Sequence, residues 1–416
     1  MPPTEGIRAT RLGNGVRVVS DADPDLRSVT VGIWVENGSR YETDAQAGIS
    51  HFLEHLFFKG TSRRSAAQIA QEVEALGGVL NAFTGKEETC YYAKALPEHL
   101  PILLDVLGDV FTQSTFPDDE IERERTVIAQ EILQVEDTPE EHVHDLFGMA
   151  FWPGHPLARP IAGTVQSIAA FGRTQFLDFM AERYRPDRIL IAAAGALTHE
   201  TLVAGVEREL GALTGASRAV DVSPPSVRGG RWSTNKDLEQ THICLGAPGI
   251  PYTDPARFAV YLLQLALGGG MGSRLFQEVR ERRGRAYTVY AFHSGFRDTG
   301  CFGVYAATSP QWVEEVVEVC RATFADVMRS GLQPEELARV KTQMKGGLLL
   351  GLETSDSRMT RLARTTLHFG RDVPVEEVCA GVDAVTNDAI VEAATRIFGG
   401  DVLNVTVLGP GGPAEA

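Results

Sequence analysis

Two histidines and a glutamate have the types and spacing of a metal-dependent hydrolytic centre. His51, Glu54 and His55 form an H-x-x-E-H pattern within the otherwise apolar segment 51–57. On a helix, residues four apart project from one face with about 5–6 Å between their Cβ atoms, so both imidazoles can bind one metal ion. A zinc ion lowers the pKa of a bound water to about 7, and Glu54 stands where it can accept the proton. The alternative is a helix whose histidines are satisfied by neighbouring side chains.

Zinc that activates water needs a third protein ligand and one open position. Asp, Glu, Cys and His elsewhere in the chain are the candidates. Residues 101–150 are rich in them, with 13 acidic and two basic side chains. A solvated helix face explains many such acidic runs. The residues alone therefore leave the third ligand open.

Length, charge and cysteine usage limit the classes of protein. The 416 residues exceed the usual size of one domain, which predicts two. A formal net charge of −16 argues against unaided binding to nucleic acid or to an anionic membrane, and leaves a basic partner open. The five widely spaced cysteines form no C-x-x-C pair, and neither an N-terminal signal nor a run of 18 apolar residues occurs. These features predict a cytoplasmic protein with reduced thiols and no membrane segment.

An internal repeat divides the chain almost in half. The Gly-, Ser- and Pro-rich stretch 216–232 predicts a linker between domains 1–215 and 233–416. An offset of 211 residues aligns Trp34 with Leu245 and Cys90 with Cys301. Both halves repeat one order of alternating strands and long helices, and the runs at 189–197 and 402–410 predict buried strands. The pattern predicts an α+β fold of two homologous halves.

The second half repeats the scaffold without the metal-binding side chains. Under the same offset, the three residues of the H-x-x-E-H pattern align with Leu262, Leu265 and Ala266. We therefore expect the first half to be the zinc-binding catalytic half.

Several motifs in a fixed order resemble the pitrilysin or insulysin family of zinc peptidases, most closely its mitochondrial processing peptidase branch and the β-subunit there. The resemblance covers almost the whole chain. It rests on HFLEHLFFKGT (51–61), GGVLNAFTGKEETCYYAK (77–94), ERERTVIAQEI (122–132), HPLARPIAG (155–163) and SRLFQEVRERRGRAYTVYA (273–291). It implies that each half is a two-layer α/β domain with a mostly antiparallel sheet packed against helices, the fold of mitochondrial processing peptidase-like metallohydrolases.

The resemblance implies roles for two glutamates of the acidic segment. Glu131, 76 residues after His55, takes the position of the third zinc ligand. Glu124 lies two helical turns earlier on the same face and would orient a ligand histidine, which fixes the tautomer of the imidazole. An exposed glutamate in a salt bridge is the alternative for Glu124.

The resemblance also implies substrate-binding positions. Leu80, Asn81 and Ala82 match the edge strand to which an extended peptide adds as a further strand. From the second half, Tyr287 would donate a hydrogen bond to the developing oxyanion, and Arg280 would bind carbonyls of the substrate backbone.

Together these features predict a zinc-dependent metalloendopeptidase that cleaves extended peptides or unfolded polypeptide segments inside a dimeric chamber. The chain carries both the zinc ligands and the Arg/Tyr pair, so we expect a homodimer. The alternatives are a non-catalytic subunit of a larger assembly and a zinc subunit that needs a different partner chain. His142, His144 and His155 are not expected to bind metal, because residues two apart face different sides of a helix and an His-Pro pair more often forms a turn.

Overall fold

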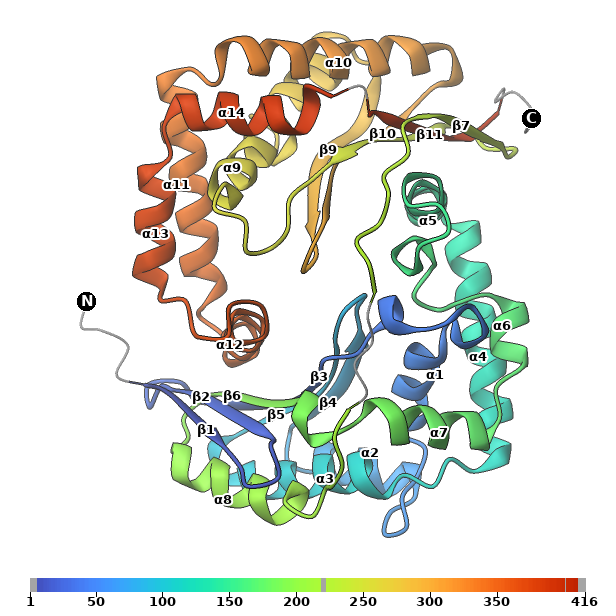
Figure 1. The fold of residues 1–416 in the computed structure, drawn as a ribbon, viewed down its shortest axis with the longest axis vertical. Coiled ribbons are helices and arrows are strands. Elements are labelled where there is room, and N and C mark those ends of the chain that lie inside the picture. Colours follow the sequence, from blue (N-terminus) through green and yellow to red (C-terminus); the bar gives the residue numbers. More distant parts are fainter. Residues whose placement is uncertain (1–5, 218–221, 401, 411–416) are drawn as a thin grey trace. The chain divides into compact units, whose positions relative to one another are not determined.

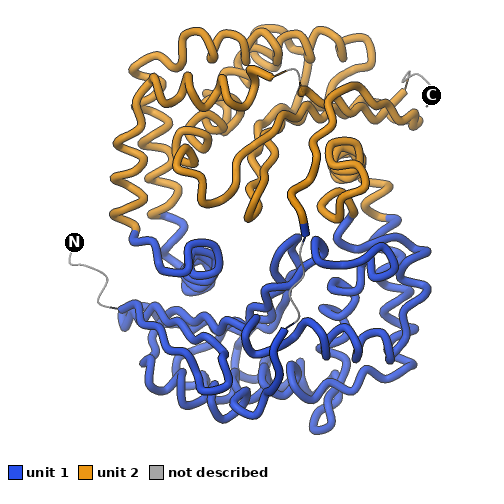
Figure 2. The backbone as a smooth tube through the Cα atoms, in the orientation of Figure 1, with its two compact units in different colours: residues 1–133, 160–222, 350–374 blue, residues 134–159, 223–349, 375–416 orange. Residues whose placement is uncertain are grey.

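The chain forms two compact units in the computed structural model, which describes residues 6–217, 222–400 and 402–410. Each unit is assembled from three separate stretches of chain (Figure 2). Unit 1 comprises residues 1–133, 160–222 and 350–374, and unit 2 comprises 134–159, 223–349 and 375–416. The first five residues, part of the predicted linker at 218–221, residue 401 and the last six residues lie outside the described ranges.

Unit 1 contains a six-stranded mixed sheet with the strand order β1-β2-β6-β3-β5-β4. The pair β2 and β6 is parallel, and every other neighbouring pair is antiparallel. The wholly buried strand β6 lies in the middle of the sheet, whereas β4 lies at one edge and pairs with β5. The strands are β1 (Ile7–Arg11), β2 (Arg17–Ala22), β3 (Val29–Val35), β4 (Val79–Thr84), β5 (Thr89–Ala95) and β6 (Ile189–Gly195).

Helices of unit 1 gather mainly on one face of its sheet. The core there includes buried residues of α1, α3, α4, α7 and α8, with Phe57 at the centre of a group of aromatic rings. The helices are α1 (Ile49–Leu56), α2 (Ala66–Glu74), α3 (Leu100–Gln113), α4 (Asp118–Asp137), α6 (Val165–Ala169), α7 (Arg173–Arg183), α8 (His199–Leu210) and α12 (Ser355–Phe369).

Unit 2 repeats most of this sheet. Its strand order is β7-β11-β8-β10-β9, with β7 and β11 parallel and the remaining neighbours antiparallel. The same sequence of one parallel and three antiparallel pairs runs from β2 to β4 in unit 1. The strands are β7 (Gly230–Asn235), β8 (Thr241–Pro248), β9 (Ala286–Gly295), β10 (Gly300–Thr308) and β11 (Asn404–Gly409).

The main core of unit 2 lies between its sheet and α9, α10 and α14. Phe324 of α10 and Phe398 of α14 stack there with 4.1 Å between their ring centroids. The helices are α5 (Pro139–Phe151), α9 (Arg257–Gly268), α10 (Val313–Ser330), α11 (Pro334–Gly351), α13 (Val375–Ala384) and α14 (Asn387–Phe398).

One helix from each half of the chain packs in the unit built mainly from the other half. In unit 1, α12 crosses the face of the sheet opposite α3 and α8 (Figure 1), where the Trp34 indole donates to Met359 Sδ at 3.2 Å. In unit 2, α5 covers the corresponding face, with Phe147 and Phe151 against Cys244 and Leu408. Each sheet is therefore covered on both faces, the second by a single helix.

The predicted α+β class and its two sheet-plus-helix halves are confirmed, as are the buried strands expected at 189–197 and 402–410. The sequence boundaries 1–215 and 233–416 remain a prediction about where the repeat divides.

The alignment of the two halves at an offset of 211 residues fails at one strand. Trp34 packs against α12, but Leu245 belongs to the core on the opposite face of its sheet. A slip by one residue moves a strand side chain to the other face, which accounts for the difference.

Within the described ranges, no helix is both long and apolar enough to cross a membrane. All five cysteines are free thiols there, and four of them are buried.

Candidate metal centre

Helix α1 is held rigidly, because its apolar side chains and its N-terminus are both fixed. Phe52, Leu53 and Leu56 are fully buried in the core of unit 1, which leaves the opposite face for His51 and His55. The carboxylate of Glu42 accepts hydrogen bonds from the backbone amides of Gly48 and Ser50, each at 2.9 Å. An anion at a helix N-terminus is favoured by the free amides and by the helix dipole.

Gly48 begins this helix with a φ of 94°, a conformation that favours glycine. A Cβ atom at this position would lie 2.6 Å from the carbonyl oxygen of Ala162. The chain can therefore enter α1 at this angle only with a glycine.

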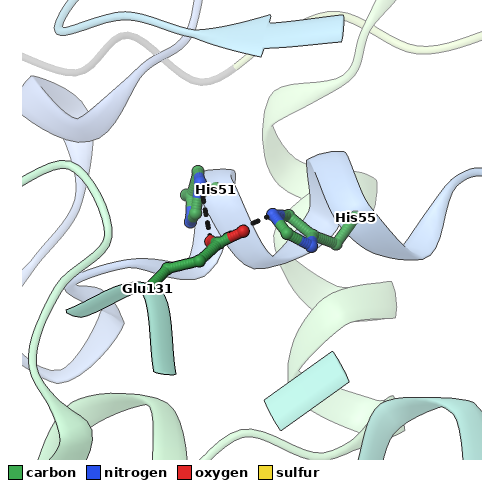
Figure 3. Close-up of side chains that lie close together, drawn as sticks. All are labelled: His51, His55 and Glu131. Carbon is green, nitrogen blue, oxygen red and sulfur yellow. Dashed lines mark ion pairs between the residues drawn. The ribbon is translucent and has the colours of Figure 1, made fainter. Parts of the chain in front are cut away.

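The two imidazoles of α1 converge on the carboxylate of Glu131, which α4 supplies (Figure 3). Oε2 of Glu131 lies 3.9 Å from Nε2 of His51 and 3.5 Å from Nε2 of His55. The imidazole centroids are 4.8 Å apart. In the described part of the chain, these three residues form the one group of metal-binding side chains whose ligand atoms all lie within 4.8 Å of one another.

The donor set and its dimensions fit zinc. Two imidazoles and one carboxylate, with a fourth position left for water or substrate, are typical of catalytic zinc sites. Bonds of about 2.0–2.1 Å in tetrahedral geometry separate neighbouring ligand atoms by roughly 3.3–3.4 Å. The observed separations of 3.5 and 3.9 Å between nitrogen and oxygen are close to this value.

His51 is in the form that binds metal. Burial, and to a smaller extent the neighbouring His55, lowers the pKa of His51 to about 4. Its Nδ1 is buried and has no hydrogen-bond partner among the described residues. The ring is therefore neutral near pH 7, as a metal ligand must be.

The carboxyl group of Glu54 is largely buried and has a raised pKa. Burial raises the pKa of Glu54, and the nearby Glu131 also raises it, while hydrogen bonds from Thr84 and the neighbouring His55 oppose this shift. Its Oε2 is buried and has no hydrogen-bond partner in the described chain. A raised pKa and a free oxygen beside three ligands suit a group that accepts and returns a proton.

Glu124 contacts Nδ1 of the His55 imidazole, where a residue that orients a metal ligand is expected. Its Oε2 lies 3.0 Å from Nδ1 of His55, which leaves Nε2 directed toward Glu131. Glu124 is 5% exposed and so is not the solvent-exposed salt-bridge residue of the alternative interpretation. Its Oε1 accepts from Lys59 at 2.6 Å.

The predicted substrate strand lies beside α1. Leu80, Asn81 and Ala82 belong to β4, which stands at the edge of the sheet and pairs with β5 on one side. Asn81 is exposed, and its side-chain oxygen accepts from the amide of Ala82 at 2.8 Å.

Arg280 and Tyr287 lie next to each other in unit 2. Arg280 belongs to a π-helical segment, Phe276–Arg282, and Tyr287 is near the start of β9. The guanidinium lies 4.5 Å from the centroid of the Tyr287 ring and donates to its backbone oxygen at 3.1 Å. Tyr287 is 71% exposed, so its hydroxyl is accessible.

Two of the three other histidines considered in the sequence have protein partners in unit 2. Nε2 of His144 lies 3.1 Å from the Tyr290 hydroxyl, and its ring packs among aromatic side chains. His155 accepts from the amide of Leu157 at 3.1 Å and caps a short turn. His142 is half-buried on α5, and its Nδ1 has no hydrogen-bond partner among the described residues.

Sequence reasoning did not identify Glu42, Lys59 or Thr84 as parts of this site. Lys59 lies inside the HFLEHLFFKGT motif, whose lysine was given no role. Thr84 ends the strand that was expected to bind peptide. Glu42 precedes α1 by several residues, and an acidic residue near a helix start is the only signal that pointed to it.

Comparisons with known proteins show the family to which the chain is similar. A family model described as insulinase, peptidase family M16, matches residues 17–165, and one described as the peptidase M16 inactive domain matches residues 170–344. An uncharacterized zinc protease of Bacillus subtilis is 39% identical, over 94% of this chain and 96% of its own length. An uncharacterized zinc protease of Streptomyces coelicolor is 40% identical, over 97% of this chain and 90% of its own.

Solved structures share the fold. A protease from Helicobacter pylori superposes with a TM-score of 0.91 at 21% identity, covering 97% of this chain and 99% of that chain. A protein from Pseudomonas fluorescens, described as a peptidase M16 inactive domain, gives a TM-score of 0.90 at 21% identity, with 98% and 99% covered.

Proposed function

Because the chain belongs to peptidase family M16, the insulinase family, we propose that it is a zinc-dependent endopeptidase that hydrolyses extended peptides or unfolded polypeptide segments. The observation that carries this proposal is the convergence of His51, His55 and Glu131, whose ligand atoms lie within 4.8 Å of one another. The relatives named as zinc proteases support zinc as the cofactor.

Zinc held by these side chains supplies Lewis acidity toward a peptide carbonyl and toward water. Glu54 accepts the proton of the attacking water at its unpartnered Oε2 and passes it to the departing amine nitrogen. Glu124 holds Nδ1 of His55, so that the imidazole keeps the orientation and tautomer that a ligand needs.

Strand β4 provides the surface for the substrate. Its outer edge can pair with the backbone of an extended peptide, and backbone pairing tolerates many side-chain sequences. Leu80, Asn81 and Ala82 are the positions that we place beside the bond to be cleaved. The acidic character of residues 101–150 favours basic peptides among the possible substrates.

A mixed peptide library tests the proposed activity. We expect the zinc-loaded protein to cleave unstructured peptides, a metal chelator to stop cleavage, and added zinc to restore it, because water activation needs the ion. Mass spectrometry of the products reports the cleavage sites and any preference for basic residues. Cleavage that continues in a chelator would contradict the zinc mechanism. Bound zinc without any cleavage would favour the alternative of a subunit that is non-catalytic or needs another partner chain.

We further propose that two copies of the chain form the working enzyme, in which the zinc site of one copy is completed by Arg280 and Tyr287 of the other. We also propose a location in the cytoplasm, which is supported by the five free thiols, four of them buried. The donor role of Tyr287 is supported by its exposed hydroxyl and by the guanidinium stacked on its ring.

Mixing two defective variants tests this arrangement. Tyr287→Phe is expected to lower kcat about 10²-fold by removing one oxyanion donor, and Glu54→Gln removes the proton acceptor. Co-expressed in one cell, the two variants should form mixed dimers with one intact site and recover part of the wild-type activity. A double variant carrying both changes in every chain is the control and should stay inactive. No recovery on mixing, together with a monomeric mass for the active wild type in sedimentation, would contradict the proposal.

A further inference from the structure

Lys59 connects the turn after α1 to the buried carboxylate of Glu124. Its Nζ lies 2.6 Å from Oε1 of Glu124, while Oε2 of the same carboxylate lies 3.0 Å from Nδ1 of His55. The side chain of Glu124 is 7% exposed, and that of Lys59 is 30% exposed. Both oxygens of this carboxylate are therefore engaged, one by a cation and the other by a ligand imidazole.

The negative charge of the buried Glu124 carboxylate has to be balanced by a cation, and a metal-binding His55 does not supply that charge. A buried charge is tolerated when it is paired and hydrogen-bonded, and it becomes costly when its partner is removed. A metal-binding imidazole is neutral, so it gives Glu124 a hydrogen bond without a compensating charge. The neighbouring cations of α4 have other partners: Arg123 pairs with Asp119, and Arg125 pairs with Glu122. Among the residues that the structure describes, Lys59 is the Lys or Arg side chain that pairs with Glu124.

The ion pair also joins the two helices that carry the metal ligands. Lys59 follows directly on α1, which bears His51 and His55, whereas Glu124 and Glu131 both belong to α4. With Oε1 held by the ammonium group, Oε2 is directed at Nδ1 of His55, and Nε2 of the same ring faces Glu131 at 3.5 Å. Fixing the carboxylate thus fixes the ring.

The backbone around Lys59 is itself fixed. Its amide donates to the carbonyl oxygen of Leu56 at 3.1 Å. The next residue, Gly60, has a φ of 129°, and its carbonyl oxygen accepts from the amide of Thr115 at 3.1 Å. The ammonium group is therefore presented from a defined turn and does not come from a freely moving loop.

We propose that Lys59 is a positioning residue of the metal site, which acts through Glu124 to hold His55 in the orientation that binds zinc. This inference rests on the proposed zinc site. It predicts an effect on metal affinity that can be measured without any assay of peptide cleavage.

The test measures zinc affinity by competition with a chromophoric chelator. Lys59→Met keeps the length of the side chain and removes the charge, and we expect zinc to bind about tenfold more weakly, at the lower end of the range for partners of a ligand. Lys59→Arg keeps the charge and should stay within roughly threefold of wild type. Lys94→Met is a matched control, because Lys94 makes a similar ion pair with Asp356 at 2.7 Å with 34% exposure, away from the metal ligands.

A double-variant cycle separates the proposed role from general stabilisation. Because Lys59 acts through Glu124, adding Lys59→Met to Glu124→Gln should cause no further loss of zinc affinity. The double variant also lacks both charges, so it remains measurable if Lys59→Met alone does not fold. Equal zinc affinity in wild type and Lys59→Met, or an equal loss in Lys94→Met, would overturn the role of Lys59. An additive loss in the double variant would do the same. Absence of zinc binding by the wild type would overturn the proposed function as well.

Discussion

Glu54→Gln is expected to leave zinc bound at full stoichiometry while kcat falls by roughly 10²–10⁴-fold, the usual contribution of a positioned acid–base group. Glutamine has nearly the same size and can still accept hydrogen bonds from Thr84, so the surroundings of α1 should be preserved. It cannot take a proton from water or return one to the departing amine. The raised pKa and the unpartnered Oε2 of Glu54 are the features that assign this task to it.

Metal analysis and peptide cleavage must be measured on the same preparation of this variant. Glu74→Gln provides a matched control, because Glu74 is exposed at the end of α2 and has no part in the site. It should cleave peptides like the wild type. A Glu54→Gln protein that retains wild-type turnover would remove Glu54 from the mechanism, whereas loss of zinc together with activity would show a structural role.

Glu131→Gln is expected to release the metal and, with it, all peptide cleavage. The carboxylate is the negatively charged member of the ligand set and lies within 3.9 Å of both imidazoles. Replacing a partner that merely orients a ligand typically costs 10–100-fold in metal affinity, so the loss of a ligand itself should weaken zinc binding by more than about 100-fold. Competition with a chelator of known affinity measures this change.

Glu136→Gln is the control for this experiment, because Glu136 lies on the same helix and is exposed. It should bind zinc as the wild type does. If Glu131→Gln kept wild-type zinc affinity, the third ligand would have to come from another residue, and the function proposed for Glu131 would fail.

The sequence predicted the parts of the site that depend on local spacing. Two histidines four residues apart share a helix face, and so do two glutamates seven residues apart, and both pairs lie as this periodicity requires. The association of the two helices did not follow from spacing, since the choice of Glu131 depended on the family resemblance. Distances now place its carboxylate beside both imidazoles.

Residue spacing could not predict contacts between residues that lie far apart in the sequence. Lys59 and Glu124 belong to different elements, and no periodic pattern links a turn to a helix 65 residues later. Likewise, the packing of α12 on the sheet of unit 1 depends on the shapes of two buried surfaces, such as Met359 against Trp34. The alignment of the halves failed at Trp34 because two buried strands of similar composition can be matched one residue out of register.

The most direct test is a crystal structure of the zinc-loaded protein with diffraction data collected on both sides of the zinc absorption edge. We expect a single strong anomalous peak about 2.0–2.2 Å from a nitrogen of His51, a nitrogen of His55 and an oxygen of Glu131, with Glu54 facing the fourth position. An ion held by other residues, or no ion at this position in a protein that cleaves peptides, would contradict the proposed mechanism.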